Sequence, residues 1–407
     1  MAVKPGYKQT EVGVIPEEWE VKPFGALFTF RNGVNADKNS YGQGVRFINV
    51  LEPITYSHIN GPEIQGQVTL PEPVSVSYEV RLGDVLFNRT SETQEEVALA
   101  ATYLGSERVV FGGFVIRGRP TAGNLDPVYS GYALRAPCIR SQIIPMGQGA
   151  IRANIGQSNL SLVLAPVPPL SEQRAIATVL SDMDALLGAL ERLIAKKRDL
   201  KQAAMQQLLT GQTRLPGFHG EWEVKRLGEI CEIAMGRTPP RLKQALWGHG
   251  YKWLSIADLQ TKFVSESKEQ ITELAASTMT IIPKGTLLMS FKLSIGRLCF
   301  AGCDLFTNEA ICSFNKLQAS GDFLYYALGR TDFSLYGKQA VKGYTLNKES
   351  LKIVEVHLPP LPEQTAIAAV LTDMDSELAA LEQRLAKTRA LKQGMMQELL
   401  TGRTRLL

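Results

Sequence analysis

One segment of this 407-residue chain occurs twice, and this repeat constrains the fold more than any other feature. PPLSEQRAIATVLSDMDALL begins at Pro168, and PPLPEQTAIAAVLTDMDSEL begins at Pro359. The similarity runs without a gap over residues 168–215 and 359–406, where about two-thirds of the positions are identical. Two copies separated by a long stretch of other sequence indicate a scaffold element that is used twice, and not a solenoid.

Each copy carries apolar residues at alternating spacings of three and four, which is the pattern of one face of a long helix. The stripe consists of Ile176, Leu180, Met183, Leu187, Leu190 and Ile194 in the first copy, and of Ile367, Leu371, Met374, Leu378, Leu381 and Leu385 in the second. It then shifts phase through Leu200, Ala204 and Leu208, and through Leu391, Met395 and Leu399. Such a shift is typical of a stutter or a change of packing partner.

Start and stop signals frame both predicted helices. Pro-Pro precedes each copy, Ser171 can cap the first helix, and Pro362 fits the first turn of the second, where its missing N–H costs little. Gly211 and Gly402 follow the letters LLT and end both patterns. Each helix would have about 40 residues and a length of roughly 60 Å. Because a small domain cannot bury so long a helix, we expect the two helices to pack on each other.

A shorter motif repeats ahead of each long segment. EEWEVKPFG at 17–25 is similar to GEWEVKRLG at 220–228, and the block that follows each motif alternates Gly turns with apolar strands. The order is therefore motif, globular block and long helix, repeated once. This order predicts an α+β fold with two pseudo-repeated, strand-rich α/β domains. We place the first domain at 1–167, the central helix at 168–212, the second domain at 213–358 and the C-terminal helix at 359–407.

The composition is that of an ordinary globular protein, with 44% hydrophobic residues, 8% aromatic residues and a net charge of +4. No apolar run is long enough to span a bilayer, and the first residues lack the apolar core of a secretion signal. The five cysteines are unevenly placed, as expected for reduced thiols. We therefore expect a cytoplasmic protein without membrane contact. No segment is basic enough to indicate nucleic-acid binding by charge alone.

The sequence lacks the signatures of common catalytic sites. It has no GxxxxGK[ST] loop and no GxGxxG motif that opens a helix after a strand. The four histidines are scattered, and Cys299 and Cys303 have no second pair at zinc-binding spacing. The EVK motifs at 20–22 and 223–225 resemble half of a nuclease signature, but no paired aspartates precede them, so we interpret them as strand starts or surface ion pairs. We expect no catalytic residue and no metal site.

Paired aspartates recur in the two predicted helices. Asp182 and Asp184 in the first helix match Asp373 and Asp375 in the second. Residues at i and i+2 point to different faces of a helix, so a pair with this spacing does not form a metal site by itself. We interpret these carboxylates as solvated or capping positions beside the apolar stripe.

The duplicated motif PPLSEQRAIA, LSDMDALL and LIAKKRDLKQAAMQQLLTGQTRL, preceded by the WEVKPFG-like motif, resembles the specificity subunit of type I restriction–modification enzymes. The resemblance covers essentially the whole chain. It implies two target recognition domains, each of which reads one half of a split, asymmetric DNA sequence. It also implies that the two helices form an antiparallel coiled coil, which sets the spacing of the half-sites and docks the methylation subunits.

The same resemblance implies the partners and cofactors of the chain. Double-stranded DNA and two methylation subunits are the expected partners, and a restriction subunit is a further possible one. S-adenosylmethionine, Mg and ATP are expected in those partner subunits, and no cofactor is expected in this chain. The chain itself is therefore expected to be a non-catalytic subunit of a methyltransferase and endonuclease complex.

Candidate DNA-binding residues are the Arg, Lys, Asn and Gln side chains in predicted turns, because these groups pair with base edges or phosphates. They are Arg31, Asn32, Lys38, Arg89, Arg117, Arg119, Arg152 and Asn154 in the first domain, and Arg237, Arg241, Lys243, Lys292, Arg297, Lys338 and Lys342 in the second, with Tyr344 as a stacking or wedge residue. For each of them the alternative is an exposed charge or an internal salt bridge. Asn32 has the further alternative of forming an Asn-Gly turn with Gly33.

Candidate partner-binding residues are polar helix positions that match between the two copies. They are Lys196, Arg198, Lys201 and Gln202 in the first helix, and Lys387, Arg389, Lys392 and Gln393 in the second. Packing alone does not need matched polar residues, whereas two copies of one partner would. Two other functions stay open at this point: a stand-alone DNA-binding regulator or antirestriction decoy, and a protein scaffold whose blocks bind other proteins.

Overall fold

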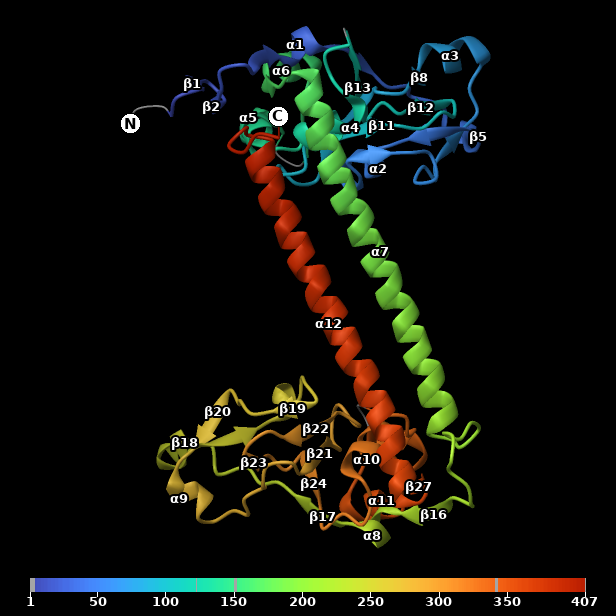
Figure 1. The fold of residues 1–407 in the computed structure, drawn as a ribbon, viewed down its shortest axis with the longest axis vertical. Helices are drawn as coiled ribbons and strands as arrows, with labels where there is room; N and C mark the ends of the chain where they lie inside the picture. The colour runs from blue at the N-terminus through green and yellow to red at the C-terminus, as the bar shows by residue number, and fades with distance from the viewer. Residues whose placement is uncertain (1–3, 122, 150–151, 341–342, 407) are drawn as a thin grey trace. The chain divides into compact units, whose positions relative to one another are not determined.

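The computed structural model describes residues 4–121, 123–149, 152–340 and 343–406, which form two compact units. Unit 1 comprises residues 1–191 and 383–407, and unit 2 comprises residues 192–382. Two long helices contribute to both units, α7 (Leu170–Leu208) and α12 (Leu361–Leu399), drawn in green and red in Figure 1. The borders of the units fall inside these helices, so each unit contains one globular block and one part of each helix.

Block 1 precedes α7 and is rich in short strands. Its elements are β1 (Tyr7–Thr10), β2 (Gly13–Pro16), β3 (Glu20–Pro23), α1 (Phe24–Leu27), β4 (Phe28–Asn32), η1 (Lys38–Ser40), β5 (Tyr41–Ile48), α2 (Leu51–Thr55), β6 (His58–Ile59), β7 (Gln67–Val68), α3 (Glu72–Ser77), β8 (Glu79–Val80), β9 (Val85–Asn88), β10 (Thr90–Ser91), β11 (Ala100–Tyr103), β12 (Val109–Phe111), β13 (Val115–Pro120), α4 (Pro127–Ala133), α5 (Pro137–Ile143), η2 (Ile144–Met146), β14 (Ala153–Asn154), α6 (Gln157–Leu162) and β15 (Leu164–Val167).

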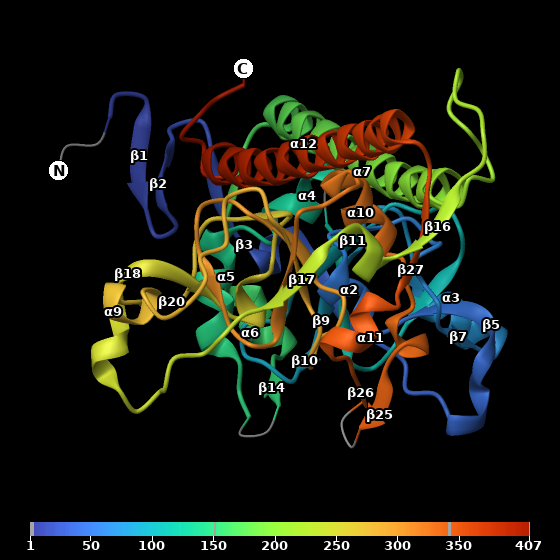
Figure 2. The same ribbon diagram turned by 90° about the horizontal axis from the view of Figure 1, so that it is seen from below.

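Two sheets organise block 1. The larger has the order β4-β13-β9-β11-β6, and the other has the order β7-β5-β12-β8. The central strand β9 is buried along its whole length, as expected for a strand covered on both faces. The β1–β2 hairpin lies near the N-terminus, apart from these sheets (Figures 1 and 2).

Block 2 lies between α7 and α12 and repeats much of this order of elements. They are β16 (Glu223–Arg226), α8 (Leu227–Ile230), β17 (Glu232–Met235), η3 (Gln244–Leu246), β18 (Trp247–Leu254), η4 (Ile256–Asp258), β19 (Phe263–Val264), β20 (Glu269–Ile271), α9 (Glu273–Ala276), β21 (Leu287–Ser290), β22 (Leu298–Ala301), β23 (Phe306–Thr307), β24 (Ile311–Asn315), α10 (Gly321–Leu328), η5 (Phe333–Leu335), β25 (Lys338–Ala340), β26 (Gly343–Thr345), α11 (Lys348–Lys352) and β27 (Glu355–Leu358).

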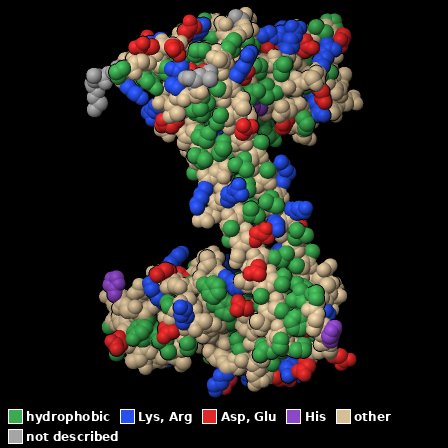
Figure 3. Space-filling model, in the orientation of Figure 1, with side chains coloured by type: hydrophobic (Ala, Val, Ile, Leu, Met, Phe, Trp, Pro, Cys, Tyr) green, Lys and Arg blue, Asp and Glu red, His purple; other side chains and the backbone are tan. Residues whose placement is uncertain are grey.

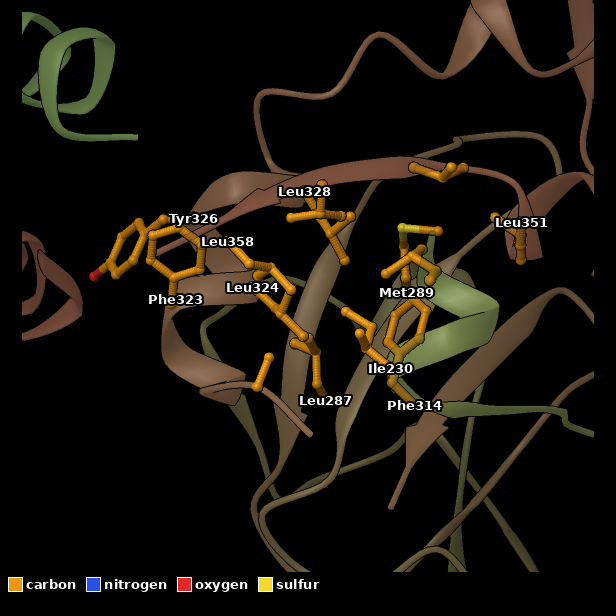
Figure 4. Packing of buried hydrophobic residues seen from close by; sticks show 14 of the residues in the cluster. Ile230, Leu287, Met289, Phe314, Phe323, Leu324, Tyr326, Leu328, Leu351 and Leu358 are labelled. Atoms are coloured by element: carbon orange, nitrogen blue, oxygen red, sulfur yellow. The ribbon is translucent and has the colours of Figure 1, made fainter. Parts of the chain in front are cut away.

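The sheets of block 2 correspond to those of block 1. The larger sheet has the order β17-β24-β21-β22-β19, which matches β4-β13-β9-β11-β6 strand by strand, and the smaller has the order β20-β18-β23. Figure 4 shows the core of this block, where Leu287 and Met289 of β21 lie among side chains from α10 and α11. Deep burial of such apolar side chains is the main term that favours folding. The two blocks are therefore two copies of one backbone plan.

The EVK motifs form strand starts and surface ion pairs, as the sequence predicts. The first lies in β3, where Lys22 Nζ is 2.5 Å from a carboxylate oxygen of Glu20. The second lies in β16, where Lys225 Nζ is 2.7 Å from Glu223. Strands β3 and β16 pair with β15 and β27, the strands that lead directly into the long helices.

The long helices run antiparallel within each unit, as the family resemblance implies. In unit 1, Asp184 and Glu191 of α7 pair with Lys392 and Arg389 of α12, so the numbering falls along one helix as it rises along the other. Unit 2 shows the same direction in the pairs formed by Lys197 with Glu377 and by Lys201 with Asp375. The apolar stripe lies on the inner side, and its residues Ile176, Leu180, Leu190, Ile194, Ile367 and Leu371 are buried.

Two details of the helix prediction are wrong. Helix α7 begins at Leu170, so Ser171 lies in its first turn and is not its cap. Leu200 and Leu391 do not continue the buried stripe, because both are exposed. Their neighbours Lys201 and Lys392 point inward instead, and they bind the carboxylates of Asp375 and Asp184. Gly211 and Gly402 end the helices in the left-handed conformation, with φ of 70° and 69°.

Candidate nucleic-acid interface

Several exposed candidate residues of each block lie in loops at one end of its five-stranded sheet. In block 1, β4 ends at Asn32 opposite the start of β13, and β9 ends at Asn88 opposite Val115. In block 2, β17 ends at Met235 opposite Cys312, and β21 ends at Ser290 opposite Ile311. The loops that follow β4 and β9, or β17 and β21, therefore meet at the same sheet end, which we call the loop end.

The loop end of block 1 presents polar side chains beside a cleft. Asn154 of β14 accepts a hydrogen bond from Thr90 Oγ1 at 2.6 Å, which fixes its amide next to the exposed side chains of Arg89 and Arg152. The adjoining cleft has a volume of about 520 Å³. It is lined by Asn49, Val50, Leu51, Ile54, Thr90, Ser91, Glu92, Glu96, Phe114 and Arg152. A cleft with cationic, amide and apolar walls has the groups needed to contact phosphates and base edges.

The loop end of block 2 has a different set of side chains. Glu309, just before β24, accepts a hydrogen bond from Thr238 Oγ1, and this bond lowers the pKa of Glu309. The positive charges of Lys292 and Arg241 lower it further, so these side chains lie around the same carboxylate. Arg237, two residues after β17, is exposed, and its side chain donates a long hydrogen bond to the carbonyl of Thr278 at 3.5 Å. This arrangement keeps several cations at one surface.

Three arginines of block 1 lie inside the fold instead. Arg31 donates two hydrogen bonds to Ser77, at 2.6 and 2.7 Å, and lies over the ring of Tyr78. Arg119 donates to both carboxylate oxygens of Asp84, which raises the pKa of this guanidinium. Arg117 is 6% exposed, donates to the carbonyl of Glu79, and has its pKa lowered by burial. Arg31 therefore holds β4 to the end of α3, and Arg117 and Arg119 hold β13 to the β8 region, so all three guanidinium groups are engaged within block 1.

Arg241 in block 2 also has internal partners. Its guanidinium lies 4.1 Å from the ring centre of Trp247 and 4.9 Å from that of Trp253, and it forms an ion pair with Glu269. The hydrogen bond to Glu269 raises the pKa of Arg241. This stacking uses the planar guanidinium as a packing element.

The other DNA candidates are exposed or lie outside the described side chains. Asn32, Lys38, Lys243, Lys292 and Arg297 are exposed. Lys342 lies outside the described residues, and the side chains of Lys338 and Tyr344 lie outside them as well.

Asn32 does not form the Asn-Gly turn that the sequence allows. It is the last residue of β4, and Gly33 has no positive φ. A Cβ on Gly33 would lie 2.0 Å from the carbonyl oxygen of Gly112, so the glycine permits close backbone packing. Gly236 has the same role beside Asn308 in block 2.

Half of the partner candidates on the helices are engaged within the chain. Arg198 pairs with Glu382, Arg389 pairs with Glu191, and Lys201 and Lys392 bind Asp375 and Asp184. These ion pairs explain why the residues match between the two copies, so the match does not by itself indicate a partner. The same pairs show that Asp184 and Asp375 are structural partners and not merely solvated positions. Lys196, Gln202, Lys387 and Gln393 are exposed.

Several exposed apolar residues at the loop ends had no sequence signal. Leu51 and Phe114 line the block 1 cleft and are 68% and 55% exposed. In block 2, Leu242 and Leu293 are 98% and 84% exposed, and each is next to a lysine. An apolar residue beside a cation in a turn looks the same in sequence as a core residue at a strand end.

Figure 3 shows that Lys and Arg are interspersed with Asp and Glu on the visible face.

Within the described ranges, no group of three or more His, Cys, Asp or Glu side chains is placed to hold a metal ion. No helix in the described part of the chain is long and apolar enough to cross a membrane.

Comparisons with known proteins agree on one family. The family model for the type I restriction modification DNA specificity domain matches residues 219–388. A specificity subunit assigned to the type I restriction enzyme MjaX of Methanocaldococcus jannaschii is 26% identical, over 98% of this chain and 97% of that protein. The specificity subunit of the type I restriction enzyme StySPI of Salmonella potsdam is 22% identical, over 96% of this chain and 90% of that protein.

Solved structures show the same fold. The HsdS subunit from Thermoanaerobacter tengcongensis aligns with a TM-score of 0.57 and 20% identity, over 96% of this chain and 98% of that one. The type I restriction–modification S subunit from M. genitalium aligns with a TM-score of 0.57 and 16% identity, over 98% of both chains.

Proposed function

This chain belongs to the family of specificity subunits of type I restriction–modification enzymes, and we propose that it acts as the non-catalytic DNA-recognition subunit of such an enzyme. Each block reads one half of a bipartite, asymmetric duplex site through its loop end. The helix pair sets the spacing of the two half-sites and docks the methylation subunits.

The observation that carries this proposal is that the two blocks share a backbone plan but differ at the loop end. The strand registers make Thr90 equivalent to Lys292 and Gly113 equivalent to Glu309. A hydroxyl therefore stands where the other block has an ammonium group, and a glycine stands where it has a carboxylate. Because hydrogen-bond donors and acceptors discriminate base edges in the grooves, such differences give each block its own preferred bases.

The net charge of the chain is consistent with a DNA-recognition subunit that works within a larger complex. A net charge of +4 over 407 residues provides little non-specific attraction for a duplex. Exposed cations such as Arg89, Arg152, Arg237 and Arg297 fix the duplex locally through its phosphates. The methylation subunits supply the remaining contacts with the backbone and hold the S-adenosylmethionine. Mg and ATP belong to a restriction subunit where one is present.

The docking surface for the methylation subunits is the outer side of the helix pair. Lys196 and Gln202 in unit 2 match Lys387 and Gln393 in unit 1, and all four side chains are exposed. The exposed leucines Leu200 and Leu391, identical between the copies, lie among them. An exposed apolar residue framed by polar ones is typical of an interaction site. Its occurrence once in each unit favours two copies of one partner.

The test is genome-wide mapping of adenine methylation in cells that express this chain together with its methylation subunit. The proposal predicts a split, asymmetric motif that disappears when this chain is deleted. If no motif depends on the chain while it still binds duplex DNA, a stand-alone regulator becomes the better account. If no duplex binds with or without the partner subunits, a protein scaffold becomes the better account.

A further inference from the structure

Asp184 of α7 joins three separate elements in unit 1. Its carboxylate accepts a hydrogen bond from the hydroxyl of Tyr132, in the short helix α4 of block 1, at 2.7 Å. It also accepts one from Lys392 of α12 at 2.5 Å. The ammonium group of Lys392 lies 5.2 Å from the ring centre of Tyr132, so the three side chains contact one another. We call this group node 1.

The same arrangement occurs in unit 2 with the helices exchanged. Asp375 of α12 accepts a hydrogen bond from Tyr326, in the short helix α10 of block 2, at 2.6 Å, and it pairs with Lys201 of α7. Lys201 lies 5.8 Å from the ring centre of Tyr326. We call this group node 2. Because each helix supplies the aspartate in one node and the lysine in the other, the two nodes are related by the internal repeat.

Each short helix is also attached to its long helix at the other end. The backbone N–H of Asp126, which caps α4, donates to Gln173 Oε1 of α7 at 2.8 Å. The backbone N–H of Ser320, which caps α10, donates to Gln364 Oε1 of α12 at the same distance. Gln173 and Asp184 lie about 16 Å apart along the helix axis, as do Gln364 and Asp375, at 1.5 Å per residue.

Two attachment points at this separation restrict the orientation of a block more strongly than a single attachment point does. Each short helix also shares an apolar core with its long helix, through Tyr129 with Ile176 in unit 1 and Phe323 with Ile367 in unit 2, but this packing is less directional than a hydrogen bond. The tyrosine fixes the tilt, because its hydroxyl binds a carboxylate that is already held by the opposite helix. Burial raises the pKa of Tyr132 and of Tyr326, so both hydroxyls keep their protons and remain donors throughout the neutral range.

The geometry points to Tyr132 and Tyr326, with Asp184 and Asp375, as positioning residues that set the tilt of each recognition block on the helix pair and thereby determine the spacer length that the complex accepts. This inference rests on the proposed function. It assigns the choice of spacer to side chains that do not touch DNA, in addition to the length of the helices. Loosening a node would let the loop ends reach half-sites at other separations.

The experiment uses the full chain in complex with its methylation subunits. Initial methylation rates are measured on duplexes that carry the native split site and on duplexes whose spacer is one base pair longer or shorter. The main variant is Tyr132→Phe with Tyr326→Phe, which removes the hydrogen bonds to Asp184 and Asp375 but leaves both Asp–Lys pairs and the packing of the two rings in place. Its matched control is Tyr103→Phe with Tyr336→Phe, because Tyr103 donates to Glu107 inside block 1 and Tyr336 accepts from the backbone of Glu355 inside block 2.

A second variant keeps the test usable if the first does not fold. It is Asp184→Asn with Asp375→Asn. Its control is Asp182→Asn with Asp373→Asn, two exposed carboxylates that have no hydrogen-bond or ion-pair partner among the described residues.

The node variants are expected to lower the ratio of the rate on the native spacer to the rate on altered spacers by about tenfold or more, because the loss of a single hydrogen bond to a charged group corresponds to at least that factor. The preferred bases in each half-site should stay the same, and both controls should keep the wild-type ratio. An unchanged ratio in folded node variants would overturn the positioning role and leave the proposed function intact. A wild-type complex that ignores spacer length altogether would instead contradict the proposed function.

Discussion

Arg405, near the end of the chain, donates two hydrogen bonds to the buried carboxylate of Glu172 at the start of α7, at 2.5 and 2.9 Å. The same carboxylate accepts a hydrogen bond from the indole N–H of Trp19 at 2.8 Å. Arg214, which follows α7, likewise donates two hydrogen bonds to the carboxylate of Glu363 at the start of α12. The segment after each long helix therefore holds the start of the other, which explains why the LLTGxTRL and PPLxEQ motifs occur together in both copies.

Replacing Arg405 by Leu should destabilise unit 1 by about 3 kcal/mol, because Glu172 would keep a buried charge without its partner. Chemical denaturation, followed by a probe in block 1, measures the change. The control is Arg403→Gln, which removes only an exposed ion pair with Glu398 at 3.8 Å and should cost less than about 1 kcal/mol. Equal effects of the two substitutions would show that the hydrogen bonds from Arg405 to Glu172 contribute no more to stability than an exposed ion pair does.

One ion pair between the long helices occurs in unit 2 but has no equivalent in unit 1. Lys197 pairs with Glu377 in unit 2, whereas the equivalent positions in unit 1 are Thr388 and Leu186. A double-mutant cycle of Lys197→Thr and Glu377→Leu should give a coupling of about 0.5 kcal/mol, since both side chains are partly exposed. The coupling should decrease at high salt. A coupling of zero at low salt would mean that the pair contributes nothing to the helix pairing.

Stability should depend on pH through His58. Its imidazole contacts the ring of Tyr132, its Nε2 donates to the carbonyl of Val128 at 2.8 Å, and its Nδ1 accepts from the hydroxyl of Ser57. Burial lowers the pKa of His58 below its ordinary value of 6.5. The unfolded chain then binds a proton more readily than the folded one, so the contribution is complete above pH 6.5 and is lost as the pH falls below it.

The corresponding measurement is the free energy of unfolding between about pH 8 and pH 5 for the wild type and for His58→Gln. The wild type should lose more stability than the variant on acidification. His249→Gln, at an exposed position, should follow the wild-type curve. The role of His58 would be refuted if its replacement left the slope of stability against pH unchanged.

The outer faces of the helices should each bind one methylation subunit. Lys196→Glu combined with Leu200→Glu places two charges on the exposed face in unit 2, and native mass spectrometry should then find one methylation subunit per chain instead of two. Lys387→Glu with Leu391→Glu should have the same effect in unit 1, and the four substitutions together should abolish binding. Lys268→Glu, at an exposed position in block 2, should leave the stoichiometry at two.

Much of the fold was predictable because its signals are local. The spacing of Ile176, Leu180 and their equivalents fixed the helices, and the Gly turns at Gly83 and Gly285, with φ of 85° and 84°, preceded buried strands as expected. The candidate site was less predictable, because whether a charged side chain is exposed or paired inside the fold depends on residues far away in the sequence. Arg119 is internal because β13 passes Asp84, and Lys201 turns inward because Asp375, 174 positions away, lies opposite.

The central claim is that each block reads its own half-site, and the most direct test is to weaken one loop end at a time and map the methylated motif. Arg237→Ala, Lys292→Ala and Arg297→Ala together alter block 2, and Arg89→Ala with Arg152→Ala alters block 1. The account predicts that each variant relaxes the sequence of one half-site only, a different half for each block, while the other half and the spacer stay the same. Loss of specificity in the same half for both variants, or in both halves at once, would contradict it.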